Sequence, residues 1–156
     1  MPEVLFYHLT ASPLEATLPE LLERSLARGW KVVLRCGSDA GLAAIDALLW
    51  TWRDDAFLPH GPAAMGHTAL QPVYLTLGEE NPAGAGVLML VDGARATPNE
   101  MARYERTCLL FDGHDPRAVE TARADWRAVT TAALPAKYWA QEQGRWVQKA
   151  ASGPAA

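Results

Sequence analysis

The sequence predicts a single three-layer α/β domain, in which helices cover both faces of a mostly parallel, mixed sheet. Two observations lead to this prediction. Strand-like apolar runs alternate with amphipathic helical segments along the chain, and the length of 156 residues suits one domain. Hydrophobic residues make up 49% of the chain and charged residues 21%, a balance typical of globular proteins. We place the domain at residues 1–149 and expect a flexible tail of small residues at 150–156.

The chain begins with a predicted β-α-β unit. The segments Val4–Leu9 and Lys31–Cys36 are apolar runs of strand length. Between them we expect a helix that starts late or kinks at Pro19 and ends near Gly29. Its apolar face consists of leucines at helical spacing, namely Leu14, Leu18, Leu21, Leu22 and Leu26. The two strands are expected to be parallel neighbours with a right-handed crossover.

The middle of the chain predicts two further helices and three strands. Ser38 is a suitable cap for a helix that continues to about Trp52. A short helix is expected after Thr97, because Pro98 and Glu100 complete a capping signature. The three strands are expected at Val73–Leu77, Val87–Val91 and Cys108–Phe111.

The last third predicts one long helix and a closing strand. Asp115 and Pro116 mark the start of a helix that runs to about Thr131. The segment Lys137–Val147 is typical of an edge strand, or of a strand and a turn. Strands and helices thus alternate through the whole sequence, as the predicted fold class requires.

The charge of the chain argues against direct binding of nucleic acid. The formal net charge is -4, whereas a phosphate backbone favours proteins with many Lys and Arg contacts. The basic side chains are concentrated toward the C-terminus, where residues 101–156 carry eight basic and six acidic groups. Most are arginines, which bind carboxylates as well as phosphates. This region therefore suits an acidic protein partner at least as well as DNA.

The cysteines and the N-terminus indicate the compartment. Cys36 and Cys108 lie far apart in strand-like apolar segments, which is typical of reduced core thiols. The N-terminus has no positively charged region followed by a long apolar run, and no segment approaches the roughly 20 apolar residues of a membrane span. We therefore expect a cytoplasmic protein that does not associate with membranes.

The sequence contains no recognisable catalytic or cofactor motif. A P-loop requires Gly-Lys-Ser/Thr, but none of the three lysines follows a glycine run. The segment Gly84–Gly86 precedes a strand instead of a helix, so we interpret it as a turn and not as a dinucleotide site. The four histidines lack metal-ligand spacing. We expect no catalytic residues, no cofactor and no metal.

Two alternatives to a non-catalytic protein stay open at this point. Ligands in parallel sheets bind at the carboxyl ends of strands, where we expect Gly37–Ser38 and Gly113–His114. The chain would then be a small nucleotide-binding α/β enzyme. Arginines and tryptophans of the last third would alternatively bind single-stranded DNA directly, although the net charge disfavours this.

An aromatic patch is expected after the second predicted helix. Trp50 falls off the apolar stripe of that helix, and the following loop carries Phe57 and Pro59. These three residues would form an exposed surface that anchors a partner. The alternative is that they cover the helix end as part of the core.

A second binding surface is expected on the last helix. Arg123, Trp126 and Arg127 stand at positions i, i+3 and i+4, so they share one face. Two guanidiniums beside an indole suit an acidic peptide that ends in an aromatic residue. The alternative is a solvated basic face with Trp126 turned toward the sheet.

Four segments give the chain a resemblance to a known family. They are Phe6-Tyr7, Ile45–Trp50, the Phe-Leu-Pro-His-Gly loop at 57–61, and Tyr138–Gln141 with Gly144 and Trp146. On these segments the sequence resembles the chi subunit of bacterial DNA polymerase III holoenzyme along nearly its whole length. The resemblance implies a non-catalytic α/β accessory subunit that joins the clamp loader and takes part in DNA replication.

The resemblance also implies two partners and a site for each. Trp50, Phe57 and Pro59 would face the psi subunit of the clamp loader or an equivalent partner. Arg123, Trp126 and Arg127 would hold the acidic C-terminal tail of single-stranded DNA-binding protein. Contact with nucleic acid would then be mainly indirect, through that protein.

Overall fold

The structure is a computed structural model that describes residues 2–10, 13–51, 60–62, 73–81, 84–143 and 145–152. These residues form one eight-stranded sheet in the order β3-β4-β2-β5-β6-β1-β7-β8. Every neighbouring pair is parallel except β7 and β8. The strands are β1 (Glu3–Leu9), β2 (Val32–Arg35), β3 (His60–Pro62), β4 (Val73–Thr76), β5 (Val87–Leu90), β6 (Arg106–Asp112), β7 (Ala136–Glu142) and β8 (Arg145–Ser152).

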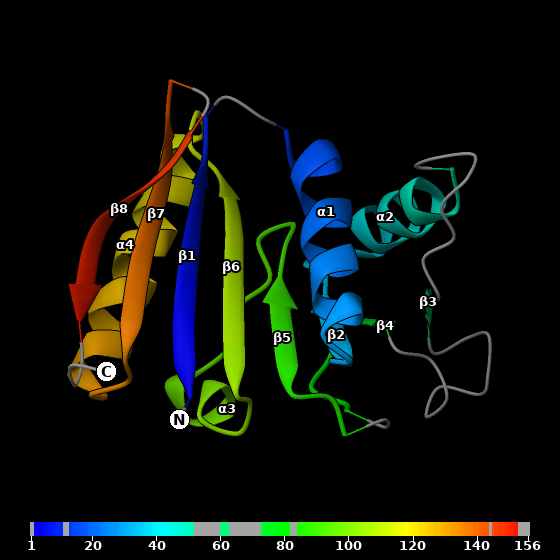
Figure 1. The fold of residues 1–156 in the computed structure, drawn as a ribbon, viewed down its shortest axis with the longest axis horizontal. Helices are drawn as coiled ribbons and strands as arrows, with labels where there is room; N and C mark the ends of the chain where they lie inside the picture. The colour runs from blue at the N-terminus through cyan, green and yellow to red at the C-terminus, as the bar shows by residue number, and fades with distance from the viewer. Residues whose placement is uncertain are drawn as a thin grey trace.

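Helices cover both faces of this sheet. They are α1 (Leu14–Ala27), α2 (Asp39–Thr51), α3 (Pro98–Met101) and α4 (Pro116–Thr131). Figure 1 shows α1 and α2 in front of the sheet and α4 behind the end formed by β1, β7 and β8. Each face has its own hydrophobic core, because successive residues of a strand point to opposite faces. The predicted three-layer α/β architecture is therefore confirmed.

The strand order differs from the prediction in one respect. β1 and β2 are parallel but are not neighbours, because β5 and β6 lie between them. All four residues of β5 are buried, as are Thr107–Leu110 of β6. Strands that are apolar on both faces gain most from central positions, so these later strands separate the first two. The alternation of strands and helices along the sequence does not specify the order of the strands in the sheet.

The helix caps largely follow the sequence signals. The Ser38 hydroxyl accepts the N–H of Gly41 at the start of α2, and Thr97 and Glu100 form a complete capping box on α3. Asp115 caps α4, whose bounds agree with the prediction. α1 is the exception, because its N-cap residue Pro13 forms no side-chain cap. The helix begins at Leu14 and continues through Pro19, so of the two expected outcomes, a late start or a kink, the late start is not observed.

The C-terminal segment forms a hairpin. The single edge strand or strand and turn expected at 137–147 is two antiparallel strands, β7 and β8. β8 extends to Ser152, which pairs with Ala136, so the first three residues of the expected tail belong to the sheet. β8 is thereby the edge strand at this end of the sheet.

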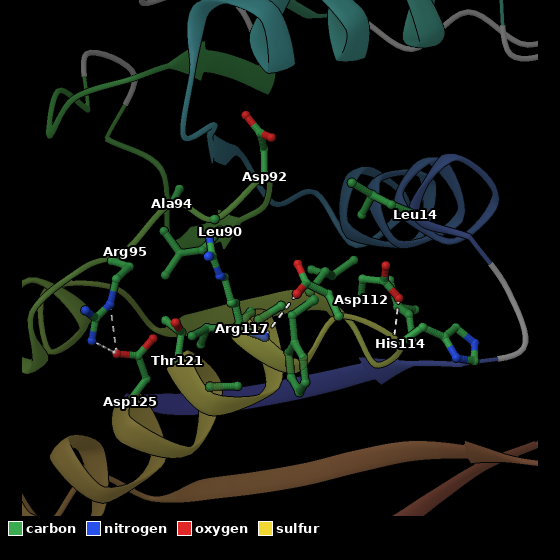
Figure 2. Close-up of a pocket in the computed structure, with 18 of the residues that line it drawn as sticks. Leu14, Leu90, Asp92, Ala94, Arg95, Asp112, His114, Arg117, Thr121 and Asp125 are labelled. Atoms are coloured by element: carbon green, nitrogen blue, oxygen red, sulfur yellow. Dashed lines mark hydrogen bonds and ion pairs between the residues drawn. The ribbon is translucent and has the colours of Figure 1, made fainter.

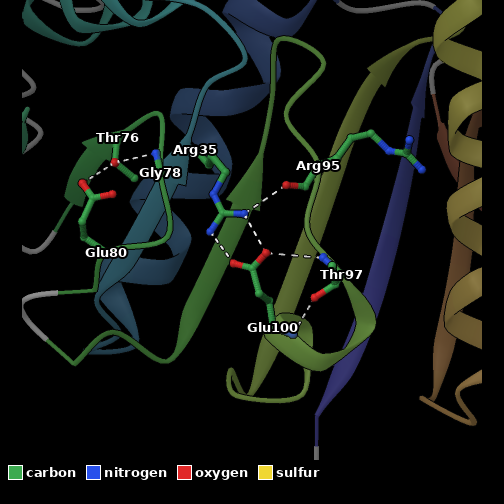
Figure 3. A network of polar contacts seen from close by, with 7 residues as sticks. All are labelled: Arg35, Thr76, Gly78, Glu80, Arg95, Thr97 and Glu100. Carbon is green, nitrogen blue, oxygen red and sulfur yellow. Dashed lines mark hydrogen bonds and ion pairs between the residues drawn. The ribbon is translucent and has the colours of Figure 1, made fainter.

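A buried ion pair joins β2 to α3, and a further hydrogen bond joins β2 to the loop before α3 (Figure 3). The guanidinium of Arg35 donates to Glu100 at 2.8 Å and to the carbonyl of Arg95 at 3.0 Å. Burial acts to raise the pKa of Glu100, but the hydrogen bond and charge of Arg35 outweigh it, so the net pKa is lowered. Next to this pair, Glu80 accepts the hydroxyl of Thr76, and this hydrogen bond lowers the pKa of Glu80. The network fixes the loop that leads from β5 to α3.

Cys36 and Cys108 are both free and buried, which confirms the interpretation as core thiols. Burial raises the pKa of each to about 12, so neither is a thiolate near neutral pH. None of the helices within the described ranges has the length and apolar content needed to cross a membrane.

Candidate functional site

Helix α4 carries the three residues predicted to bind an acidic tail. Its inner side is fixed by Ala122, Asp125 and Val129, which are buried. Arg123 and Arg127 are exposed, and Trp126 is partly buried between them. Because Arg123 lies at i relative to Trp126 at i+3 and Arg127 at i+4, the three residues share one face of the helix.

The indole of Trp126 also contacts the sheet. Its ring meets Phe6 edge-on at a centroid distance of 5.3 Å and Tyr138 at 6.0 Å. The ring therefore turns inward, as the alternative interpretation expects, while part of it stays accessible between the arginines. Such a ring offers an apolar contact that is already held in place by its neighbours.

Trp126 belongs to an aromatic cluster, which we define as Phe6, His8, Phe111, Trp126 and Tyr138. His8 lies 5.1 Å from Phe111 and 5.8 Å from Tyr138, measured between ring centroids. Its Nδ1 atom lies 2.6 Å from the Tyr138 hydroxyl, which is within hydrogen-bond distance. All members except Phe6 are partly exposed. The cluster thus provides a half-buried aromatic surface beside the arginines of α4.

The charge of Arg123 reaches the polar pair of this cluster. Burial lowers the pKa of His8 below its usual 6.5, and Arg123 acts in the same direction. Burial raises the pKa of Tyr138 above 10, and Arg123 opposes this change. His8 is therefore neutral at pH 7 and the positive charge here comes from α4.

The surface predicted from the sequence lacks three of these members, namely His8, Phe111 and Tyr138. His8 shares a face with Phe6 because they are two residues apart in β1, and it aligns with Phe111 in the parallel pairing with β6. The alternation of side chains between the two faces of a strand therefore predicts which residues of one strand lie on the same face. The neighbouring strand and its register come only from the tertiary structure.

The other predicted patch lies elsewhere on the molecule. The backbone of Trp50 is in the last turn of α2, on the opposite face of the sheet from α4. Its side chain, and all of Phe57 and Pro59, lie outside the described residues. The prediction that these three form a patch stays a prediction.

A cavity of about 890 Å³ opens at the carboxyl ends of β1, β5 and β6 (Figure 2). This is where an α/β enzyme would bind its ligand. Five carboxylates line the cavity against two guanidiniums, so a polyphosphate would meet repulsion. The carboxylates are Glu15, Asp92, Asp112, Asp115 and Asp125, and the guanidiniums are Arg95 and Arg117.

Most of these carboxylates hold the surrounding turns. Asp125 pairs with Arg95 at 2.5 Å, and Asp92 accepts the Ser38 hydroxyl at 2.8 Å. Asp112 accepts the backbone N–H of His114, also at 2.8 Å. Their geometry is thus explained by the fold. Among the described residues, His, Cys, Asp and Glu form no group that would hold a metal.

Comparisons with known proteins agree on one family. The family model described as DNA polymerase III chi subunit, HolC, matches residues 1–137. The DNA polymerase III subunit chi of Pseudomonas aeruginosa strain PAO1 is 30% identical over 130 residues, which cover 81% of this chain and 88% of that protein.

A second relative agrees with the first. The probable DNA polymerase III subunit chi of Rickettsia prowazekii strain Madrid E is 25% identical over 103 residues, covering 66% of this chain and 59% of that protein. The family match includes α4 and every residue of both predicted sites. This chain therefore belongs to the DNA polymerase III chi subunit family.

Proposed function

We propose that this chain is a non-catalytic accessory subunit of DNA polymerase III that holds the acidic C-terminal tail of single-stranded DNA-binding protein on α4. The observation that carries the proposal is the pair of exposed arginines, Arg123 and Arg127, on the same helix face as the half-buried Trp126. Membership of the chi family supports a place in the replication complex of the cytoplasm.

The three residues of this site have different roles. Each guanidinium offers a planar fork of donors, so Arg123 and Arg127 hold carboxylates of the tail by charge-assisted hydrogen bonds. The accessible part of Trp126 packs against the terminal aromatic side chain of the tail. A short peptide held in this way binds with a Kd in the micromolar range, about 8 kcal/mol.

The second part of the proposal concerns the clamp loader. Trp50, Phe57 and Pro59 bind the psi subunit or an equivalent partner, mostly through burial of aromatic surface. The position of Trp50 on α2 supports this division, because α2 and α4 lie on opposite faces of the sheet. Binding of one partner then keeps the surface for the other partner accessible.

The first experiment is titration calorimetry with a peptide that copies the acidic C-terminus of the host's single-stranded DNA-binding protein. We expect micromolar binding that is lost when the terminal Phe is removed. Arg123→Ala weakens binding about 10- to 100-fold, since a hydrogen bond to a charged group contributes about 1.5–3 kcal/mol. It also makes the affinity less dependent on salt.

Arg117→Ala is the matched control, because Arg117 is exposed on the same helix but lies at its start. Its affinity for the peptide should equal that of the wild type. Equal affinity of the Arg123→Ala variant would refute the tail site. Thermal stabilisation by ATP or NAD would instead favour the alternative of a nucleotide-binding enzyme. The position of the cavity is consistent with that alternative, whereas the negative charge of the cavity lining argues against it.

A further inference from the structure

The His8 ring is held from two sides. Its Nδ1 atom lies 2.6 Å from the Tyr138 hydroxyl. On its other side the ring packs against Gly113, where an added Cβ atom would lie 2.1 Å from Cδ2 and 2.2 Å from Nε2. A hydrogen bond to the Gly113 backbone also favours the protonated ring. Only glycine leaves room for the ring, so the orientation of His8 is fixed.

This arrangement determines where the protons lie. Because Nε2 lies against the Gly113 backbone, whose hydrogen bonding raises the pKa of the ring, we assign Nδ1 of the neutral ring as the acceptor of the Tyr138 hydroxyl proton. When His8 gains a proton, Nδ1 becomes a donor and the Tyr138 oxygen becomes its acceptor. The hydroxyl proton of Tyr138 is then free to bind a ligand.

Arg123 makes this position suitable for an anion. It is exposed, and the structure gives its side chain no ion pair within the described ranges. It lies one turn before Trp126 on α4, and its charge acts to lower the pKa of both His8 and Tyr138. The ring of Tyr138 also contacts Trp126, so this part adjoins the apolar portion of the proposed tail site.

We propose that the Tyr138 hydroxyl binds a carboxylate of the acidic tail together with Arg123, and that protonation of His8 strengthens this contact. The inference rests on the proposed function and adds two residues to its site. Tyr138 touches the tail, whereas His8 is a positioning residue that acts through Tyr138.

The groups that face His8 determine the direction of the pH effect. Burial and the charges of Arg123 and His114 lower its pKa, while Gly113 and Asp112 raise it, and the net pKa lies below 6.5. The ring is neutral at pH 8 and gains a proton as the pH falls below 6.5. A bound carboxylate favours the charged ring, so binding takes up a proton below pH 6.5.

The test is calorimetry with the same tail peptide from pH 8.0 to pH 5.5, in buffers of different ionisation enthalpy. The wild type should bind about tenfold more tightly at the acidic end, because a hydrogen bond to a charged group is gained. Its binding should also take up protons below pH 6.5. Tyr138→Phe keeps the ring but removes the hydroxyl, so it should lose most of this gain.

His8→Leu should bind without any pH dependence in this range. His114→Gln is the matched control, because His114 is the other described histidine near the site, and it should keep the dependence. Circular dichroism at each pH verifies that every variant is folded. The inference would be overturned if the wild-type affinity were constant from pH 8.0 to 5.5, or if Tyr138→Phe bound as tightly as the wild type at every pH. Neither result would affect the tail site itself, which the Arg123→Ala variant tests separately. No binding by the wild type at any pH would overturn both.

Discussion

Arg35 carries a charge that is almost completely removed from water. Its side chain is 5% exposed and that of its partner Glu100 is 12% exposed. A buried pair of this kind is worth little compared with an apolar pair, but removing one partner leaves the other charge uncompensated. The pair therefore matters for the position of the loop between β5 and α3 more than for the net stability of the fold.

Replacing Arg35 with Met should lower the free energy of unfolding by about 3–5 kcal/mol, because the Glu100 carboxylate stays buried without its partner. Urea unfolding measures this change. Lys137→Met, at an exposed position of β7, should stay within about 0.5 kcal/mol of the wild type. A change below about 1 kcal/mol for Arg35→Met would show that water or another group replaces the partner.

At the scale of a single element, α4 is the part that the sequence described best. Its cap, its first residue and its last residue all follow from local signals, and Asp115 accepts the N–H of Arg117 at 3.0 Å. The cap lies about two turns before Arg123 and about three turns before Trp126. Helix stability and tail binding are therefore separable.

Asp115→Ala should lower the free energy of unfolding by about 1 kcal/mol, because the first turn of α4 loses its cap. Asp115→Asn should be close to the wild type, since Asn is an equally good cap. Denaturant unfolding measures both variants, and calorimetry with the tail peptide should give the wild-type affinity for each. A loss of tail affinity in the Ala variant alone would mean that the first turn contributes to the binding site.

The whole molecule separates the two proposed surfaces. α4 packs on one face of the sheet at the end that contains β1 and β7, whereas α2 lies on the other face beside β3 and β4. The sheet between them is continuous and apolar on both faces, so it forms a rigid spacer. This arrangement suits an adaptor that links two partners at once.

We expect the psi subunit and the tail peptide to bind independently. The affinity for the peptide should change less than about twofold when psi is bound, because no described element belongs to both surfaces. Trp50→Ala should reduce psi binding in size-exclusion chromatography and leave peptide affinity unchanged, while Arg123→Ala should do the reverse. Competition between psi and the peptide would contradict the separation.

The local structure of this protein follows from short-range signals along the chain. Thr97 with Glu100, and Asp115 with Pro116, specify helix starts through contacts within one turn, and the apolar runs specify strands through their own burial. The spacing of Arg123, Trp126 and Arg127 also places them on one helix face. These signals are short in range, so a linear reading detects them.

The three-dimensional fold is needed to establish which strands are neighbours and which side chains gather at the proposed site. β5 and β6 take the central positions between β1 and β2, because strands buried on both faces compete for the centre of the sheet. That order aligns His8 with Phe111, and the pairing of β1 with β7 brings Tyr138 to His8 across 130 residues of chain. The physical reason is that strand order depends on burial summed over distant segments, which no local pattern in the sequence records.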